Sequence, residues 1–273
     1  IYLSPAWPNF AAALEIAGGK AVPVTLDFSE NGWTLDLERF EAAITPRTRA
    51  LFINTPSNPT GWAADRDTLS AILEIARRHG IWIIADEIYA KFWYGEGDRA
   101  PSFLDVQAPE DRILYVNSFS KNWAMTGWRV GWIKAPPPLM PVFENLVQYS
   151  TSGVPQFMQR GAVAALDKGD DFVASQVARA AEALDIVTKS LSATGKVRFA
   201  RPGGAFYLFF SIDGVEGSMQ SAMRLVDETG VGLAPGVAFG AGGEGFFRLC
   251  FNRGLGQIAE ASRLLEAFIS ESF

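Results

Sequence analysis

The sequence predicts an α/β protein built on a mostly parallel central sheet that is sandwiched by helices. Short apolar runs alternate along the chain with longer amphipathic segments, which is the pattern of strand–helix–strand crossover units. Residues 81–85 are apolar throughout, as expected for a parallel strand covered on both faces. Length and composition alone do not decide whether the 273 residues form one large domain or two smaller ones.

The first two thirds of the chain supply most of the expected sheet. Strands are expected at the start of the chain and at residues 21–24, 50–53, 81–85 and 113–116. Helices are expected at residues 9–17, 35–44, 65–79, 139–149, 156–167 and 171–193. The helix over 65–79 has its apolar residues on one face, and Gly80 stands where a helix commonly ends.

The last third has shorter elements in a different order. Strands are expected at residues 197–199, 204–210, 232–234 and 246–251, with helices at 218–229 and 258–269. The pattern of crossover units therefore ends near residue 193, and a separate α+β arrangement follows.

Composition excludes several classes of function. The net charge of −6, with acidic and basic residues interspersed, provides no basic stripe for nucleic acid and no polybasic arm for a membrane. No apolar run approaches the roughly 20 residues of a membrane span, so a soluble cytoplasmic protein is expected. Cys250 is the only cysteine, which excludes an internal disulfide and a cysteine metal site. His79 is the only histidine, and its place before Gly80 predicts a helix C-terminal residue with no catalytic role. Acid–base chemistry is left to lysine, tyrosine or carboxylates.

The segment 118–129 carries the strongest chemical signal. It places the amine of Lys121 on a serine-rich turn and the guanidinium of Arg129 eight residues further on. A lysine amine condenses with a carbonyl to form a Schiff base, and serine hydroxyls and an arginine suit phosphate oxygens. Pyridoxal phosphate is the common cofactor that has both an aldehyde and a phosphate. Taken alone, such a lysine is more often a solvated surface residue.

Two upstream motifs extend this signal. Residues 54–61 (Asn-Thr-Pro-Ser-Asn-Pro-Thr-Gly) follow one apolar run, and residues 85–89 (Ala-Asp-Glu-Ile-Tyr) follow another. With the lysine segment, they resemble the class I and II aminotransferases of the aspartate aminotransferase fold, the pyridoxal-phosphate fold type I. The resemblance runs from Trp7 to Arg248. Because ligands bind at the carboxyl ends of parallel strands, the motifs are expected to meet in one crevice.

The resemblance implies the catalytic residues. Lys121 would form the Schiff base with pyridoxal 5′-phosphate and then move the substrate Cα proton. Asp86 would lie against the pyridine nitrogen and keep it protonated, so that the ring draws electrons from the substrate. Tyr89 would hydrogen-bond the phenolic oxygen of the ring. Without the lysine motif, Asp86 is equally well a capping carboxylate and Tyr89 a core aromatic residue.

The remaining cofactor contacts are implied in the same way. Asn58 would share the phenolic oxygen with Tyr89, although an asparagine before proline is also a common turn residue. Ser118 and Arg129 match the phosphate contacts, and a charge inside the apolar run that contains Arg129 is expected to be buried and to need a partner. Trp7 matches the ring that stacks on the pyridine face.

Substrate binding is implied for Arg248, with Asn58 and Trp7 beside it. Arg248 lies within an apolar strand near the C-terminus and matches the arginine that grips the substrate α-carboxylate. A structural salt bridge is the alternative for this residue. The same alignment predicts cis peptide bonds at Ser4-Pro5 and Asn58-Pro59.

The resemblance also implies how the chain is organised. Residues 1–170 would form the large cofactor-binding domain, 171–193 an interdomain helix and 194–273 a smaller α+β C-terminal domain. Residues 1–7 resemble the end of a buried strand, so the sequence is expected to lack an N-terminal part of the family fold. Family members are usually homodimers with active sites at the interface, and a homodimer is therefore expected here.

The function that follows is amino-group transfer between an amino acid and a 2-oxo acid, with aspartate or a broad range of donors. A carbon–sulfur lyase, a decarboxylase or an aminocyclopropane-type synthase would use the same constellation. A non-catalytic regulatory domain of this fold is the alternative from another class, because fold alone does not establish function.

Overall fold

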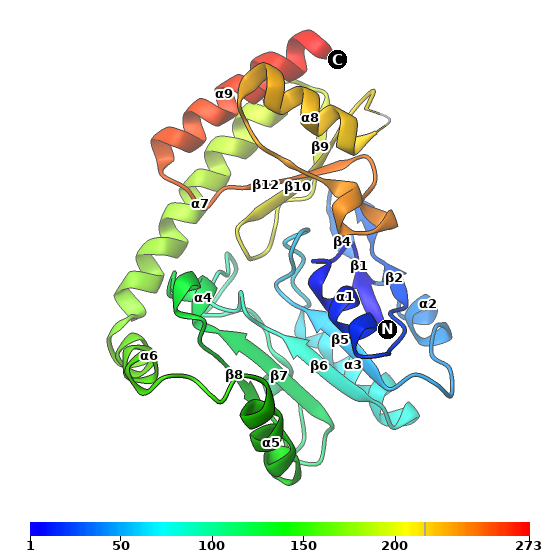
Figure 1. Ribbon diagram of the computed structural model, residues 1–273. Helices are drawn as coiled ribbons and strands as arrows, with labels where there is room; N and C mark the ends of the chain where they lie inside the picture. The colour runs from blue at the N-terminus through cyan, green and yellow to red at the C-terminus, as the bar shows by residue number, and fades with distance from the viewer. Residues whose placement is uncertain (216) are drawn as a thin grey trace.

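The computed structural model describes residues 1–215 and 217–273, and its larger sheet is mostly parallel as expected. This sheet has the strand order β2-β1-β5-β6-β7-β8, and β8 alone runs antiparallel to its neighbour. Its strands are β1 (Tyr2–Ser4), β2 (Pro23–Thr25), β5 (Ala50–Asn54), β6 (Trp82–Asp86), β7 (Ile113–Ser118) and β8 (Gly131–Lys134). The strands β5, β6 and β7 lie side by side and run parallel, so three motif-bearing strands end at one edge of the sheet (Figure 1).

Helices lie between these strands and after the last of them. They are α1 (Asn9–Ile16), α2 (Leu37–Ala42), α3 (Arg66–His79), α4 (Phe119–Asn122), α5 (Met140–Ser150) and α6 (Gln156–Lys168). In α3, Asp65 caps the start by accepting the Thr68 N–H at 2.8 Å, and Gly80 ends the helix in the left-handed conformation with φ 62°. Apolar side chains of α3 share one core with Leu51 and Ile83 of the sheet.

A second, antiparallel sheet has the order β11-β12-β10-β9. Its strands are β9 (Val197–Phe199), β10 (Tyr207–Ile212), β11 (Ala234–Pro235) and β12 (Phe246–Cys250). The long helix α7 (Asp170–Ala193) runs from α6 beside the large sheet up to this second sheet, where α8 (Ser218–Thr229) and α9 (Leu255–Ser272) also lie (Figure 1). The second sheet, α7 and α9 have a hydrophobic core of their own, which includes Leu184, Phe210 and Leu265.

Short elements complete the fold. They are the hairpin strands β3 (Asp27–Ser29) and β4 (Gly32–Thr34), and the 3-10 turns η1 (Phe103–Asp105), η2 (Thr126–Trp128), η3 (Pro137–Leu139), η4 (Gly236–Phe239) and η5 (Ala241–Gly243). The hairpin was not predicted from the sequence, because its strands are only three residues long. The Phe28 and Trp33 rings on it lie 5.0 Å apart, and Trp33 in turn lies 5.9 Å from Phe209 of β10.

The loop before β10 brings the two sheets together. The N–H groups of Gly203 and Gly204 both donate to the carbonyl oxygen of Gly61, at 3.0 and 3.2 Å. A Cβ on Gly61 would lie 2.2 Å from Pro202 Cβ, and one on Gly204 would lie 2.6 Å from Pro56 Cγ. This close approach explains why β10 begins at Tyr207, three residues later than the pattern predicted.

Two further expectations are settled by the backbone. The peptide bonds Ser4-Pro5 and Asn58-Pro59 are cis, as the family alignment predicted, and Thr55-Pro56 is cis as well. The expected burial of Arg129 inside a strand was wrong. Arg129 is exposed, has φ 52° and precedes β8, because the apolar run turns through η2 before the strand begins.

Among the described residues, no helix combines the length and apolar character that spanning a bilayer requires.

Candidate functional site

The sequence-predicted site residues lie at the carboxyl ends of β5, β6 and β7. Asp86 and Ser118 are the last residues of β6 and β7, Asn58 follows β5 in a loop, and Lys121 lies on α4 directly after β7. A cavity of about 300 Å³ at this edge is lined by Asn58, Asp86 and Trp7, together with Asn54, Phe10 and Phe52. The parallel arrangement therefore collects groups that are far apart in the sequence, as expected for open α/β sheets.

Asp86 is a carboxylate that is surrounded by protein and faces the crevice. Its only side-chain hydrogen bond within the described residues is a long one, from the Ile88 N–H at 3.3 Å. Burial raises the pKa of Asp86 to about 6, against smaller opposing effects of that hydrogen bond and of the Lys121 charge. A partly buried carboxylate with so few donors favours a cationic or N–H partner in the cavity.

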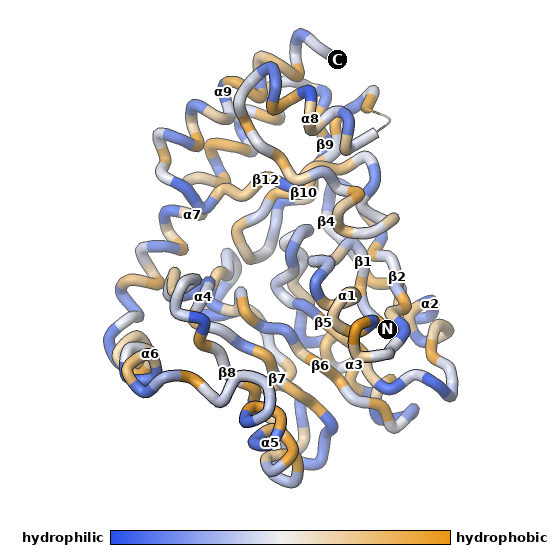
Figure 2. The backbone as a smooth tube through the Cα atoms, viewed as in Figure 1, coloured by the Kyte–Doolittle hydropathy of each residue, from blue (hydrophilic) through white to orange (hydrophobic). Residues whose placement is uncertain are grey.

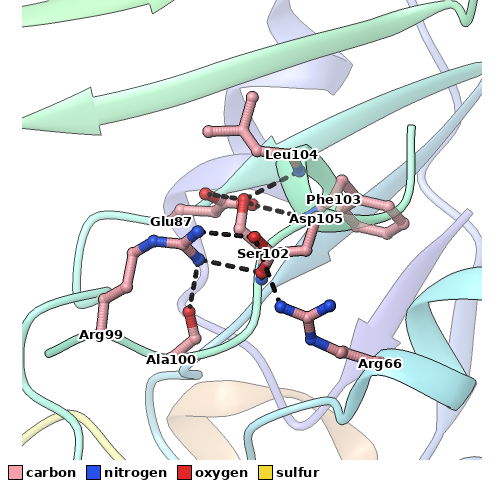
Figure 3. Close-up of polar contacts among 8 residues, drawn as sticks. All are labelled: Arg66, Glu87, Arg99, Ala100, Ser102, Phe103, Leu104 and Asp105. Carbon is pink, nitrogen blue, oxygen red and sulfur yellow. Dashed lines mark hydrogen bonds and ion pairs between the residues drawn. The ribbon is translucent and has the colours of Figure 1, made fainter. Parts of the chain in front are cut away.

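Glu87, the next residue, points away from Asp86, because successive side chains at a strand end face opposite sides. Its buried carboxylate accepts the Ser102 hydroxyl at 2.7 and 2.8 Å and the Phe103 N–H at 3.3 Å (Figure 3). Asp105 accepts a hydrogen bond from the Ser102 N–H at 2.9 Å and one from each terminal nitrogen of Arg99, at 3.0 and 2.6 Å. This network holds the turn that carries Asp86.

Lys121 is partly buried where α4 meets the crevice. Burial lowers the pKa of its amine, and the charges of Arg129 and Arg248 lower the pKa further, whereas Cys250 and Asp86 act in the opposite direction. A lowered pKa increases the fraction of neutral amine near pH 7, which is the form that acts as a nucleophile or base.

Arg248 extends over the crevice from β12. Its Nη1 donates to Asn58 Oδ1 at 2.9 Å, its guanidinium carbon lies 5.6 Å from the Trp7 ring centre, and its buried Nε has no partner within the described residues. No ion pair of Arg248 is found in that part of the chain, so the structural salt bridge considered above is absent there. The guanidinium is thus held by an amide and by aromatic rings, with an N–H left for an anion.

Asn58 and Trp7 form the wall of the crevice beneath Arg248. Asn58 is buried, its main-chain N–H donates to Asn54 Oδ1 at 2.9 Å, and its carbonyl oxygen accepts the Trp7 N–H at 3.1 Å. The side-chain nitrogen of Asn58 has no protein partner among the described residues. The Trp7 ring is 45% exposed, so part of its surface is open to a planar ligand.

Ser118 and Arg129 lie together on the opposite side, around the β7–α4 turn. Ser118 Oγ caps α4 by accepting the Ser120 N–H at 3.0 Å and also contacts Ser120 Oγ at 3.0 Å. Arg129 makes one hydrogen bond, from Nη1 to the Thr126 carbonyl oxygen at 2.8 Å. Hydroxyls, a helix start and an exposed guanidinium suit a phosphate group.

Two residues of the site were not assigned from the sequence. Asn54 Nδ2 donates to the Asp86 carbonyl oxygen at 3.1 Å, which ties β5 to β6 at the crevice. The Tyr207 hydroxyl lies 3.0 Å from the Tyr89 hydroxyl, and both rings are buried. Asn54 lies within a quoted motif and could have been found there, whereas Tyr207 is 118 residues from its partner and gives no local signal.

Comparison with known proteins decides the family. A family model described as aminotransferase class I and II matches residues 1–268. The chain belongs to this family. It is 34% identical over 270 residues to the aspartate aminotransferase of Thermotoga maritima, covering 99% of this chain and 69% of that one. It is also 34% identical over 272 residues to the arginine–pyruvate transaminase of Pseudomonas aeruginosa, covering 99% of this chain and 68% of that one.

The aminotransferase also matches solved structures across nearly its full length. The aromatic aminotransferase of Pyrococcus horikoshii superposes with a TM-score of 0.92 at 31% identity, covering 99% of this chain and 72% of that one. The Thermotoga maritima aspartate aminotransferase gives a TM-score of 0.90 at 33% identity, covering 99% and 69%. The chain is therefore a pyridoxal-phosphate-dependent aminotransferase of the aspartate aminotransferase fold.

The residues present fit that cofactor. Asp86 is a partly buried carboxylate that lines the cavity and has one long hydrogen bond, as the partner of a protonated ring nitrogen should be. Lys121 supplies an amine of lowered pKa, and Ser118 with Arg129 supplies donors for a phosphate. The donor set thus provides a partner for each reactive part of pyridoxal phosphate.

Proposed function

We propose that this aminotransferase transfers the amino group between an α-amino acid and a 2-oxo acid, with Lys121, Asp86 and Tyr89 as its catalytic residues. The observation that carries the proposal is the placement of Arg248. Its guanidinium lies over the same crevice as Asp86 and, among the residues that the structure describes, hydrogen-bonds Asn58 alone, while its Nε–H has no partner there. A substrate carboxylate bound there is held beside Lys121, whose pKa already responds to the Arg248 charge.

Lys121 is the proposed attachment point of the cofactor and the proposed base. Pyridoxal phosphate, when bound, supplies a conjugated ring that accepts the electrons of the substrate Cα–H bond. Lys121 takes the proton from the substrate Cα and delivers it to the cofactor carbon that is bonded to the transferred nitrogen. Its lowered pKa supports this role, because a neutral amine is the form that accepts a proton.

Asp86, Tyr89 and Asn58 are the proposed contacts of the cofactor ring. Asp86 opposes the positive charge of the ring nitrogen, and its low-dielectric surroundings strengthen that interaction. Tyr89 and the Asn58 side-chain nitrogen donate hydrogen bonds to the phenolic oxygen. Trp7 covers one face of the ring, which its half-exposed indole supports.

Ser118 and Arg129 are the proposed phosphate contacts. The exposed guanidinium and the hydroxyl lie on either side of the turn that carries Lys121. A phosphate held there fixes the cofactor at the end opposite the α-carboxylate, which Arg248 binds. The substrate is thereby oriented with its Cα toward the amine.

We propose that the donor is aspartate or one of a broad range of amino acids. The relatives named as aspartate, arginine–pyruvate and aromatic-amino-acid aminotransferases are similarly close, at 34% identity each. Aromatic rings surround Arg248, namely Trp7, Tyr207 and Phe239. A side-chain pocket beside such rings accepts apolar as well as polar groups.

The domain division and the subunit arrangement are also proposals. Residues 1–170 would bind the cofactor, 171–193 link the two parts and 194–273 form the small domain; the two separate cores support this division.

A homodimer working in the cytoplasm is proposed as well. Twelve of the nineteen exposed large hydrophobic residues identified in the described chain fall between 128 and 172, and Figure 2 shows orange stretches along α5. Surface of this kind marks an interface.

The test is an absorbance titration of the purified protein, first with pyridoxal phosphate and then with aspartate. The expected result is a visible band that converts to the pyridoxamine phosphate spectrum on adding amino acid and returns on adding a 2-oxo acid. Lys121→Ala should abolish the band. Lys91→Ala is the matched control, because Lys91 is also partly exposed but pairs with Asp170 at 3.3 Å.

Three other outcomes would contradict parts of the proposal. A band that survives Lys121→Ala would refute the assigned lysine. A 2-oxo acid released with ammonia, without pyridoxamine phosphate, would indicate lyase chemistry. A folded protein without any band would show that this chain does not form the cofactor site by itself.

Analytical ultracentrifugation of Leu146→Asp tests the dimer. Leu146 is 57% exposed, and a charge at this position should weaken the association of two subunits.

A further inference from the structure

Two tyrosines from different parts of the fold meet beside the crevice. Tyr89 follows β6 of the large sheet, and Tyr207 is the first residue of β10 in the second sheet. Their hydroxyl oxygens are 3.0 Å apart, and the residues are 2% and 6% exposed. Neither hydroxyl has another hydrogen-bond partner within the described residues. This hydrogen bond is therefore the only contact within the described residues that constrains where the two hydroxyl hydrogens point.

The Tyr207 ring also contacts Arg248. The guanidinium carbon lies 4.5 Å from the centre of the Tyr207 ring, nearer than the Phe239 ring at 4.8 Å or the Trp7 ring at 5.6 Å. Antiparallel pairing of β10 with β12 sets this position, because Tyr207 is in register with Cys250, two residues from Arg248. A cation over an aromatic face is held by the ring quadrupole, more strongly where water is excluded.

The hydrogen count gives the contact a direction. A phenol has one hydrogen and two acceptor sites. If Tyr89 donates its hydrogen to a ligand in the crevice, it can only accept from Tyr207, so the Tyr207 hydroxyl must be the donor. A hydroxyl that accepts one hydrogen bond becomes a better donor in the next, because hydrogen bonds in a chain polarise one another.

We propose that Tyr207 is a positioning residue of the transamination site, which orients the Tyr89 hydrogen through its hydroxyl and supports the Arg248 guanidinium with its ring. This inference rests on the proposed function, in which Tyr89 contacts the cofactor and Arg248 the substrate carboxylate. One side chain on β10 thereby connects the group at the cofactor with the group at the substrate. Tyr207 acts through its neighbours and has no contact of its own with the reacting atoms.

The hydroxyl is tested with Tyr207→Phe in the cofactor-loaded protein. The readout is the pH midpoint of the visible absorbance band, because a hydrogen bond donated to the phenolic oxygen stabilises its deprotonated form. Tyr89→Phe should raise the midpoint by about 1 pH unit, from the strength of a hydrogen bond to a charged oxygen. Tyr207→Phe should raise it by about 0.3 units, the cooperative part of that effect.

Two variants make this result specific. In Tyr89→Phe/Tyr207→Phe, the midpoint should equal that of Tyr89→Phe. Once residue 89 has no hydroxyl hydrogen, the hydroxyl of residue 207 has nothing to orient, so its removal has no further effect. Tyr94→Phe is the matched control, since its partly buried hydroxyl donates to the Ala205 carbonyl oxygen at 2.7 Å, beside the same strand. It should leave the midpoint at the wild-type value. The other titratable groups facing the pair are Asp86, Arg248 and Cys250, and all variants retain them.

The ring is tested with Tyr207→Leu and a carboxylate probe. Propionate has a carboxylate but no amino group, so its inhibition constant reports on Arg248. Tyr207→Phe should leave this constant within about twofold, whereas Tyr207→Leu should raise it about tenfold, the size of a desolvated cation–π contact. Far-ultraviolet circular dichroism and the melting temperature of the cofactor-free protein show whether Tyr207→Leu remains folded.

The outcomes separate this inference from the proposed function. A band that depends on Lys121 and responds to Tyr89→Phe, but not to Tyr207→Phe, overturns the positioning role while the transaminase site stands. A shift in the double variant beyond that of Tyr89→Phe overturns it as well. A folded wild-type protein without a band shows that this chain does not form the cofactor site by itself, and the role proposed for Tyr207 in that site is overturned with it.

Discussion

The two sides of the crevice are held in different ways. On the β6 side, Asp86 lies between β5 and β7, and the adjacent Glu87 is fixed by Ser102 and its network. On the β7–β8 side, Lys121 lies on a four-residue helix, and Arg129 is exposed next to a strand at the sheet edge. The chain surrounds Asp86 on all sides but the crevice, whereas the β7–β8 side leaves donors and apolar surface free.

The difference teaches which properties each side controls. Enclosure fixes the protonation and orientation of Asp86, so changes there should alter chemistry and folding together. Exposure makes Arg129 replaceable without strain, so changes there should alter ligand affinity alone. Four predictions on three variants test this contrast, beginning with the largest expected effect.

Asp86→Asn should lower the transamination rate constant by about 10³-fold, because an amide cannot oppose a positive charge in the crevice. Steady-state kinetics with aspartate and a 2-oxo acid measure the loss. Asp65→Asn is the matched control, since it makes the same charge change at a helix cap that asparagine also fills. A loss of less than tenfold would show that the enclosed carboxylate is not used in the reaction.

The same variant should stabilise the cofactor-free protein at pH 8 by up to about 3 kcal/mol. The folded-state pKa of Asp86 is raised from 3.8 to about 6. The protonated carboxyl therefore costs the folded protein no stability below pH 4, whereas the folded protein loses stability as Asp86 ionises when the pH rises through 6. Asparagine has no such loss. Urea unfolding at pH 4 and pH 8 should show the gain only at pH 8; an equal change at both values would contradict the enclosure of Asp86.

Arg129→Ala should raise the dissociation constant for pyridoxal phosphate by about 10- to 100-fold, the worth of charge-assisted hydrogen bonds to a phosphate. Its melting temperature without cofactor should match the wild type, because the side chain is exposed. Arg112→Ala is a matched control: this exposed arginine also donates to one backbone carbonyl, that of Gly80 at 2.7 Å. Equal affinities of the two variants would rule out Arg129 as a phosphate contact.

Ser102→Ala should destabilise the protein at pH 7 by about 1–2 kcal/mol, because Glu87 keeps only the 3.3 Å bond from Phe103. The Ser102 hydrogen bond lowers the Glu87 pKa against the larger effect of burial, so this difference should shrink as acid protonates Glu87. Ser70→Ala, which removes an exposed hydroxyl bonded to the Arg66 carbonyl oxygen, should change stability by less than about 0.5 kcal/mol. A difference that grows in acid would contradict the network in Figure 3.

Much of the fold was predictable because the period of apolar residues changes with each element. The helix over 65–79 is found as α3 with its cap and its terminal glycine, and the run at 81–85 is found as β6 shifted by one residue. The hairpin β3–β4 was missed, since three-residue strands are too short to show a period. The strand expected from residue 204 begins at Tyr207, because a contact with a distant loop decides its start.

The candidate site divides in the same manner. The sequence by itself determined the family motifs, the identity of the amine, carboxylate and guanidinium groups, and their position after strands, because these depend on residue types and local spacing. Only the tertiary structure decided that Arg129 is exposed, that Arg248 bonds Asn58 and that Tyr207 meets Tyr89. The exposure of Arg129 depends on the turn through η2, and the other two contacts depend on how β10 and β12 pack over the large sheet. Contacts between residues more than a hundred positions apart leave no periodic trace in the chain.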